Sequence, residues 1–306
     1  KLLERIRDQL QKRSTLDVLR NGIDWVGLKQ SIKLAEFKPA LGLNPEIMAR
    51  YSANRLRVIR QVRYSTQNEN SIDLVLFLNG LPVATLELKS DFTQSVQDAI
   101  DQYRYDRFPK TAGKTEPLLS FPQGALVHFA VSHSEVHMTT KLEGKSTKFL
   151  PFNQGDDGGK GNPENPKGGF RVAYLWEQVL ERESWLELLG RYLITTKNKK
   201  KEPDGLIFPR YHQLIATRNL IQTVLKEGAG QKYLIQHSAG SGKTNSIAWT
   251  AHFLADLHDA NQKKIFQSVI VVSDRKVIDG QLQEAIDSFQ RTVGVVATIK
   301  GDKGSK

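Results

Sequence analysis

The chain has 306 residues, of which 39% are hydrophobic and 25% charged, the balance of an ordinary globular protein. It contains no cysteine, which excludes disulfides and thiolate metal sites, and no apolar run approaches the length of a membrane span. We therefore expect a cytoplasmic protein with no membrane association. The formal net charge of +11 favours a polyanionic partner, most simply nucleic acid. Since the sequence starts at Lys1 and ends in a polar run, we interpret it as part of a longer polypeptide.

The first two hundred residues mix strands and helices. Apolar periodicity predicts strands at residues 57–64, 72–78, 82–88, 125–131 and 135–139. It predicts helices within residues 2–20, 93–107, 173–182 and 184–193. Residues 153–169 are rich in glycine and are expected to form a loop or a disordered insert. The fold class is therefore α/β, with a mixed sheet flanked by helices.

A charged, polar run at residues 197–205 separates this region from a second one, although such a run is usually only a solvated linker. Helices and strands then alternate, as in a parallel α/β sheet. The expected order is a helix at 212–226, a strand at 233–236, a helix at 243–258, a strand at 268–273, a helix at 277–290 and a strand at 294–299. We thus predict two domains, residues 1–200 and residues 201–306.

Asp73, Glu87 and Lys89 have the spacing of a PD-(D/E)xK nuclease centre. Glu87 and Lys89 lie two residues apart on one expected strand and so project to the same face. Two carboxylates and the Leu88 carbonyl offer the oxygen ligands that Mg²⁺ prefers, and Lys89 would orient the attacking water. Because Glu-x-Lys is a common triplet, a solvated edge strand is the alternative interpretation.

The turn between the two strands tests this geometry. Asn79-Gly80 is a strong hairpin signal, but a two-residue turn places Asp73 opposite Leu86, with Asp73 and Glu87 on opposite faces. A three-residue loop over Leu78-Asn79-Gly80, or a bulge elsewhere, restores a common face. We predict one of these two irregularities.

Polar residues on either side of the hairpin are further candidates. Gln102, on the following helix, is a candidate for contact with DNA or with the shell of the metal, with Tyr105 three residues later. Before the hairpin, Arg55, Arg57, Arg60 and Arg63 are suited to phosphate contacts, with ordinary surface arginines as the alternative.

A glycine-rich segment in the second region follows an apolar run and opens an amphipathic helix. Its residues Gly240, Ser241, Gly242, Lys243 and Thr244 fit a phosphate-binding loop, in which backbone N–H groups surround phosphate oxygens. Lys243 would reach the β- and γ-phosphates of ATP, and the Thr244 hydroxyl would bind Mg²⁺. A glycine-rich turn without a ligand is the alternative.

Two observations qualify the nucleotide site. Gln213 precedes the loop by about thirty residues, near the distance at which helicases place a glutamine that reads adenine, with Phe208 or Tyr211 available to stack on the base. No Asp-Glu pair follows an apolar strand before residue 306, so we do not expect ATP hydrolysis from this stretch alone.

Taken in order, these segments resemble the R (restriction and motor) subunit of type I restriction–modification enzymes. The matching stretches are residues 44–56, 60–65, 73–89, 102–107, 149–153 and 236–244, with Ser273-Asp274-Arg275 fitting a post-strand motif of the motor. The resemblance implies a PD-(D/E)xK nuclease domain followed by the start of a RecA-like superfamily 2 motor. It implies Mg²⁺ and ATP as cofactors, and double-stranded DNA with methyltransferase and specificity subunits as partners.

Three functions remain open from the sequence. The first is an Mg²⁺-dependent endonuclease joined to an ATP-driven DNA translocase, which cleaves unmodified double-stranded DNA. The second is a RecB-like helicase–nuclease of DNA repair. The third is a catalytically silent scaffold whose nuclease-like fold only binds DNA or partner subunits.

Overall fold

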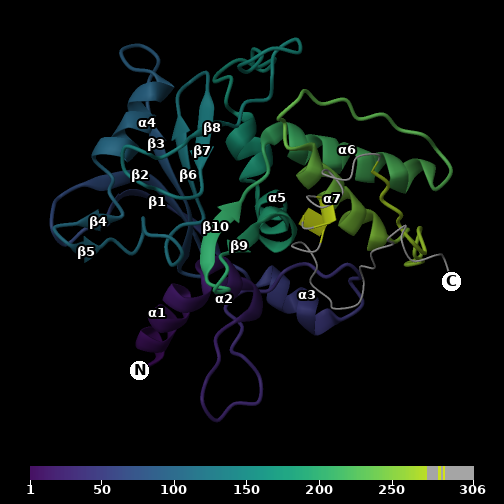
Figure 1. The fold of residues 1–306 in the computed structure, drawn as a ribbon, viewed down its shortest axis with the longest axis horizontal. Coiled ribbons are helices and arrows are strands. Elements are labelled where there is room, and N and C mark those ends of the chain that lie inside the picture. The colour runs from purple at the N-terminus through teal and green to yellow at the C-terminus, as the bar shows by residue number, and fades with distance from the viewer. Residues whose placement is uncertain (274–281, 284, 287–306) are drawn as a thin grey trace. The chain divides into compact units, whose positions relative to one another are not determined.

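The computed structural model describes residues 1–273, 282–283 and 285–286. The chain divides into two compact units, Lys1–Arg210 and Tyr211–Lys306 (Figure 1). No helix in the described ranges has both the length and the apolar character needed to cross a membrane.

A six-stranded sheet organises the first unit, in the order β1-β2-β3-β6-β7-β8 (Figure 1). Its strands are β1 (Leu56–Arg63), β2 (Ser71–Leu78), β3 (Leu81–Leu88), β6 (Val127–Val131), β7 (Val136–Thr139) and β8 (Leu150–Pro151). The pairing of β3 with β6 is parallel, and the other neighbours are antiparallel. The predicted mixed sheet flanked by helices is confirmed, and residues 153–169 form a loop, as expected.

Two short strand pairs and several helices complete this unit. The strand pairs are β4 (Lys110–Thr111) with β5 (Lys114–Thr115), and β9 (Ile194–Lys197) with β10 (Pro203–Ile207). The helices are α1 (Leu2–Arg13), α2 (Thr15–Asn21), α3 (Pro45–Ser52), α4 (Val96–Tyr105) and α5 (Arg182–Glu187), with π-helical turns η1 (Leu175–Val179) and η2 (Leu188–Tyr192). The helix expected from residue 93 begins at Val96 because Ser95 and Asp98 form a capping box there.

The two faces of the sheet are covered by different elements. Helix α4 connects β3 to β6 and packs against both; Ala99 and Ile100 of the helix contact Ala130 of β6. Phe129 points to the opposite face, where its ring meets Phe152 and Phe208. Trp185 of α5 packs on Phe208. Because both faces are covered, the central strands β3 and β6 are almost entirely buried.

The second unit contains α6 (Tyr211–Glu227) and α7 (Lys243–Ala255), which pack against each other. The strands expected at residues 233–236 and 268–273 are not formed, and this expectation was wrong for the structure as described. Parallel strands are stable when neighbours cover both faces, whereas Leu234, Ile270 and Val272 here are exposed. The strand expected at 294–299, most of the helix expected at 277–290, and Asp274-Arg275 lie outside the described residues.

Candidate functional site

The hairpin of β2 and β3 brings Asp73 and Glu87 together. Its turn is the two-residue one, with Asn79 and Gly80 both at positive φ (49° and 89°), so the three-residue loop was wrong. The predicted alternative, a bulge elsewhere, is confirmed: the register shifts between Leu76 and Phe77, which leaves Val83 as the extra residue. Leu74 therefore faces Leu86, and the next position on each strand holds Asp73 and Glu87.

Glu87 is fully buried next to a single cation. Arg107, just beyond α4, donates from Nε to Glu87 Oε1 at 2.7 Å, and both side chains are shielded from solvent. Burial raises the pKa of Glu87 to about 8; the Arg107 guanidinium opposes this rise and the Asp73 carboxylate adds to it. The other carboxylate oxygen, Oε2, is buried and accepts no hydrogen bond in the described residues, and the Glu87 side chain lies within hydrogen-bond reach of Asp73.

Asp73 is fixed from two sides. Its Oδ1 accepts a hydrogen bond from the Gln61 side chain of β1, and its Oδ2 accepts one from the Leu88 backbone N–H, both at 2.8 Å. The Asp73 side chain thus bridges β1 and the end of β3, where the β2–β3 ladder has ended at Leu74 and Leu86. This end of the hairpin opens into a hollow of about 570 Å³ that Asp73, Gln61, Arg60, Leu74 and Leu88 line, so the carboxylate is accessible.

A hard divalent cation fits this donor set. Two carboxylates on adjacent strands, with the Leu88 carbonyl nearby in the chain, supply the oxygen ligands that Mg²⁺ prefers. The buried Oε2 of Glu87 accepts no hydrogen bond in the described residues, and either a cation or the proton that its raised pKa favours would compensate for its lost solvation. Clusters of three or more His, Asp or Glu side chains that could hold a metal are absent from the described residues, so any ion here would rely on two carboxylates.

The Lys89 ammonium and the Gln102 amide oxygen form no hydrogen bond with the described residues. Lys89 lies one residue past β3, and its backbone N–H extends the parallel ladder to the Val131 carbonyl at 2.8 Å. Within the described part of the chain, its ammonium group forms no hydrogen bond or ion pair. The amide oxygen of Gln102 is buried without a hydrogen-bond partner. The Lys89 ammonium is therefore free to contact a ligand.

Helix α4 places Tyr103 against the sheet, and not Tyr105, the residue considered in the sequence analysis. Tyr105 is half exposed, with Lys145 over its ring. Tyr103 is the tyrosine that faces the sheet, and its hydroxyl lies 2.8 Å from Thr85 Oγ1. Sequence reasoning also missed Arg107, which lies two residues past the end of α4, because no sequence spacing links it to Glu87. No sequence signal identified the contact of Gln61 with Asp73.

The glycine-rich loop of the second unit is closed by its own lysine. Lys243 Nζ donates to the carbonyls of Ser238 and His237, at 2.8 and 3.2 Å. Gly240 and Gly242 have positive φ of 73° and 82°, the conformation that the loop requires, and Gly242 caps α7. Thr244 follows in the first turn of α7. The Ser241 hydroxyl is buried and has no hydrogen-bond partner.

Helix α6 supports this loop from within the same unit. Gln213 is buried, and its Nε2 donates to the Gly242 carbonyl at 2.8 Å. His212 Nε2 lies 3.0 Å from the Ser241 carbonyl, a contact that sequence reasoning missed. The role of Gln213 in reading adenine stays a prediction. Phe208 was wrong as a stacking residue, because its ring is buried among Phe129, Phe152 and Trp185 of the first unit; Tyr211 is also buried.

Comparisons with known proteins address the same two regions. Residues 2–147 match the family described as type I restriction enzyme R protein N terminus. Residues 2–147 are thus similar to the N-terminal region of type I restriction enzyme R proteins. Residues 212–302, which include the loop, match the SWI2/SNF2 ATPase family. The R-protein region thus contains the paired acids, and an ATPase-like region contains the loop.

Individual relatives agree with this assignment at low identity. A putative type I restriction enzyme MjaVIIIP endonuclease subunit of Methanocaldococcus jannaschii is 26% identical over 230 residues, which cover 73% of this chain and 20% of the relative. The MjaVIIP endonuclease subunit of the same organism is 25% identical over 90% of this chain and 24% of its own length. The SauCOLORF180P endonuclease subunit of Staphylococcus aureus (strain COL) is 23% identical over 78% of this chain and 23% of its own length. The chain therefore spans about a fifth to a quarter of these relatives.

Proposed function

We propose that this chain is the DNA-cleaving and nucleotide-binding part of a type I restriction R subunit. The observation that carries the proposal is the opposition of Asp73 and Glu87 across a bulged hairpin, with one Glu87 oxygen left unpartnered. The R-protein family match and the names of the relatives, which are endonuclease subunits, support it. The substrate would be unmodified double-stranded DNA, and the partners would be the methyltransferase and specificity subunits.

The proposed reaction is hydrolysis of a phosphodiester. Water adds its oxygen to phosphorus, the bond from phosphorus to the leaving deoxyribose oxygen breaks, and that oxygen takes up a proton. When bound, Mg²⁺ lowers the pKa of a coordinated water and stabilises the negative charge that develops. Asp73, Glu87 and the Leu88 carbonyl would hold the ion, and Arg107 keeps Glu87 Oε2 available by occupying Oε1. The Lys89 ammonium would orient the water, and Gln102 would contact DNA or the ion's outer shell.

The second part of the proposal concerns ATP. Backbone N–H groups of Gly240, Ser241 and Gly242 would surround the phosphates at the N-terminus of α7, and Thr244 would contact Mg²⁺. Lys243, which now donates to loop carbonyls, would exchange these for phosphate oxygens. In the complete subunit, this RecA-like lobe would drive DNA translocation, as the match to an ATPase family supports.

Cleavage by the complete enzyme tests the nuclease centre. We expect Asp73→Asn and Lys89→Ala to lower the Mg²⁺-dependent cleavage rate at least about a thousandfold, since each removes a group that acts on the transition state. Asp91→Asn, an exposed acid two residues past Lys89, is the matched control and should cut normally. Undiminished cutting by Asp73→Asn would remove the site assignment. Cleavage without methyltransferase and specificity subunits would favour the repair nuclease.

ATP binding tests the loop separately. Lys243→Ala should weaken ATP binding to the chain at least about tenfold and abolish ATP-driven translocation in the complete enzyme. Lys232→Ala, an exposed lysine of the same unit, provides the control for loss of charge. Translocation by Lys243→Ala at the normal rate would contradict the nucleotide site, whatever happens to cleavage.

A further inference from the structure

Three arginines near the edge of the sheet have guanidinium groups that form no ion pair with the described residues. β1 is the outermost strand of the six, and its side chains from Arg57 to Gln61 are exposed. Within the described residues, the guanidinium groups of Arg55, Arg57 and Arg60 form no hydrogen bond or ion pair. Guanidinium groups present several donors in a plane and are suited to phosphate oxygens.

Neighbouring cations differ in being engaged already. Arg63, at the end of the same strand, is paired with Glu69. Arg50 pairs with Glu36 at 3.1 Å, and Lys33 Nζ donates to the Arg20 carbonyl at 2.8 Å. The unpaired positive charge near this edge is therefore concentrated on Arg55, Arg57 and Arg60.

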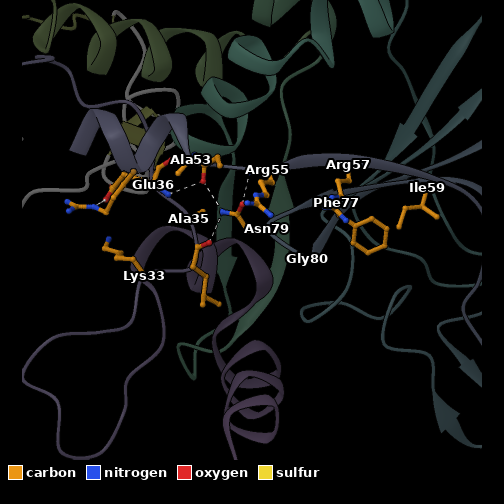
Figure 2. Close-up of a pocket in the computed structure, with 13 residues that line it drawn as sticks. Lys33, Ala35, Glu36, Ala53, Arg55, Arg57, Ile59, Phe77, Asn79 and Gly80 are labelled. Atoms are coloured by element: carbon orange, nitrogen blue, oxygen red, sulfur yellow. Dashed lines mark hydrogen bonds and ion pairs between the residues drawn. The ribbon is translucent and has the colours of Figure 1, made fainter. Parts of the chain in front are cut away.

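Two adjoining hollows follow the strand that bears these arginines. One, of about 720 Å³, is lined by Arg55, Arg57 and Ile59 with the Phe77 ring. Figure 2 shows Arg55, which precedes β1, followed by Arg57 and Ile59 along the strand, with Phe77 beside them. The other is the hollow of Asp73, which Arg60 and Gln61 line. The two hollows border consecutive residues of β1, Ile59 and Arg60, whose side chains project to opposite faces of this edge strand.

The strand register shows how far each arginine lies from Asp73 along β1. Gln61 stands beside Asp73 and donates to it at 2.8 Å. Arg60 is its neighbour, and Arg57 lies four residues back, about 13 Å along a strand that rises about 3.3 Å per residue. A DNA strand advances about 3.4 Å per nucleotide along the helix axis, so the arginines span on the order of four to six nucleotides.

We propose that Arg55, Arg57 and Arg60 form a track along the exposed edge of the sheet, with Arg57 on one face of β1 and Arg60 on the other. The track binds the phosphate backbone of one DNA strand and leads it away from Asp73. The side chains of Ile59 and Phe77 line the same hollow as Arg55 and Arg57 and give this part of the track an apolar surface suited to deoxyribose. Such contacts position the duplex and do not read its sequence. The claim that DNA is cut at the Asp73 end of the track rests on the proposed nuclease function. The claim that the track binds DNA does not depend on that function.

The salt dependence of DNA binding tests the track. Binding of the full chain to a fluorescent 20-base-pair duplex is measured by anisotropy in EDTA, so that no cleavage occurs. Each lost phosphate contact lowers the slope of log K against log salt by about 0.9. The triple variant Arg55→Ala/Arg57→Ala/Arg60→Ala should therefore lose about 2.7 of slope on duplexes of any sequence, whereas Arg57→Lys should keep most of its contribution.

A matched control distinguishes phosphate contacts at these three arginines from a general effect of lost positive charge. Arg63→Ala removes an arginine of the same strand that is already paired, and it should leave the slope unchanged. An unchanged slope in the triple variant, or an equal loss of slope in Arg63→Ala, would overturn the proposal that these arginines bind DNA. With an unchanged slope, the arginines would be assigned to another macromolecule. Circular dichroism spectra identical to that of the unsubstituted chain establish that the variants are folded.

The same variants distinguish this inference from the nuclease proposal. If the slope falls as expected while Asp73→Asn still cuts, the track stands and the nuclease centre is wrong. If the slope does not change while Asp73→Asn abolishes cutting, the nuclease centre stands and the DNA strand follows another path.

Discussion

The two candidate sites are held by different kinds of structure. In the first unit, Asp73 and Glu87 are positioned by a strand register and by a buried ion pair with Arg107, which lies twenty residues from Glu87 in the chain. In the second unit, the loop around Gly242 is held by hydrogen bonds from Lys243 and Gln213, without strands beside it in the described residues. The comparison suggests that the acids depend on long-range packing, whereas the loop depends on local backbone conformation. Substitutions can test each half of that contrast.

The largest effect is expected at Arg107. At a pH above 8, where Glu87 is ionised, Arg107→Leu leaves the buried carboxylate without its cation, and breaking a buried pair in this way costs about 3–5 kcal/mol of unfolding free energy. Urea unfolding followed by circular dichroism measures the loss. Adding Glu87→Gln to Arg107→Leu should recover more than half of it, because the second change removes the uncompensated charge.

A surface pair gives the control for this prediction. Arg171 pairs with Glu164 at 3.1 Å, and both side chains are exposed. Arg171→Ala should therefore cost less than about 1 kcal/mol. Equal losses for Arg107→Leu and Arg171→Ala would mean that the buried pair does not stabilise the site.

A smaller effect is expected in the loop. Alanine at Gly242 would place its Cβ 2.5 Å from Gln213 Nε2, in addition to requiring a positive φ of 82°. Gly230 also has positive φ (100°), but its Cβ would meet nothing within 4 Å. We expect Gly230→Ala to cost about 1 kcal/mol from backbone strain alone and Gly242→Ala about twice that.

Hydrogen exchange of α6 and α7 measures this difference. Gly242→Ala should speed exchange in α6 around Gln213, since the amide that bonds the Gly242 carbonyl is displaced, whereas Gly230→Ala should not. Identical exchange in the two variants would show that the contact from α6 does not hold the loop.

The smallest effect concerns His128, a buried histidine on β6. Burial lowers the pKa of His128 to about 3, and its Nδ1 lies 2.7 Å from Thr85 Oγ1. A neutral histidine in the folded state contributes stability that is full above the unfolded pKa of about 6.5 and falls as the pH drops toward 3. At pH 5.5, the loss from this residue should be about 1.4 kcal/mol.

The comparison with His128→Asn isolates that contribution. Glu87, whose pKa is raised, acts in the opposite direction over the same range, so the pH dependence of the unsubstituted chain alone does not report on His128. Between pH 7.5 and 5.5, the unsubstituted chain should lose about 1.4 kcal/mol more than His128→Asn in urea unfolding. Parallel pH profiles would contradict a neutral, buried imidazole.

Local patterns made much of this arrangement predictable. The Asn79-Gly80 turn, the helices at residues 211–227 and 243–255, and the glycines of the loop follow from residues close together in the sequence. The acid–lysine spacing also predicted that the hairpin must contain an irregularity. The location of the bulge at Val83 could not be predicted, because it depends on how the apolar residues of β2 and β3 pack on both faces.

Long-range contacts account for the rest. The pairing of Arg107 with Glu87 and of Gln61 with Asp73 joins residues on separate elements, and neither contact has a sequence spacing of its own. The strands expected at 233–236 and 268–273 failed for a related reason: alternation of apolar residues predicts a strand, but a parallel strand forms only where neighbours and helices cover it.

The central claim is that Asp73 and Glu87 hold one divalent cation between them. The most direct measurement is anomalous scattering from crystals of the chain soaked in Mn²⁺, which takes oxygen ligands as Mg²⁺ does. The account predicts one strong peak within coordination distance of carboxylate oxygens of both residues, and its loss in Asp73→Asn. A peak held by other residues, or none at this position under conditions in which the complete enzyme cuts DNA, would contradict it.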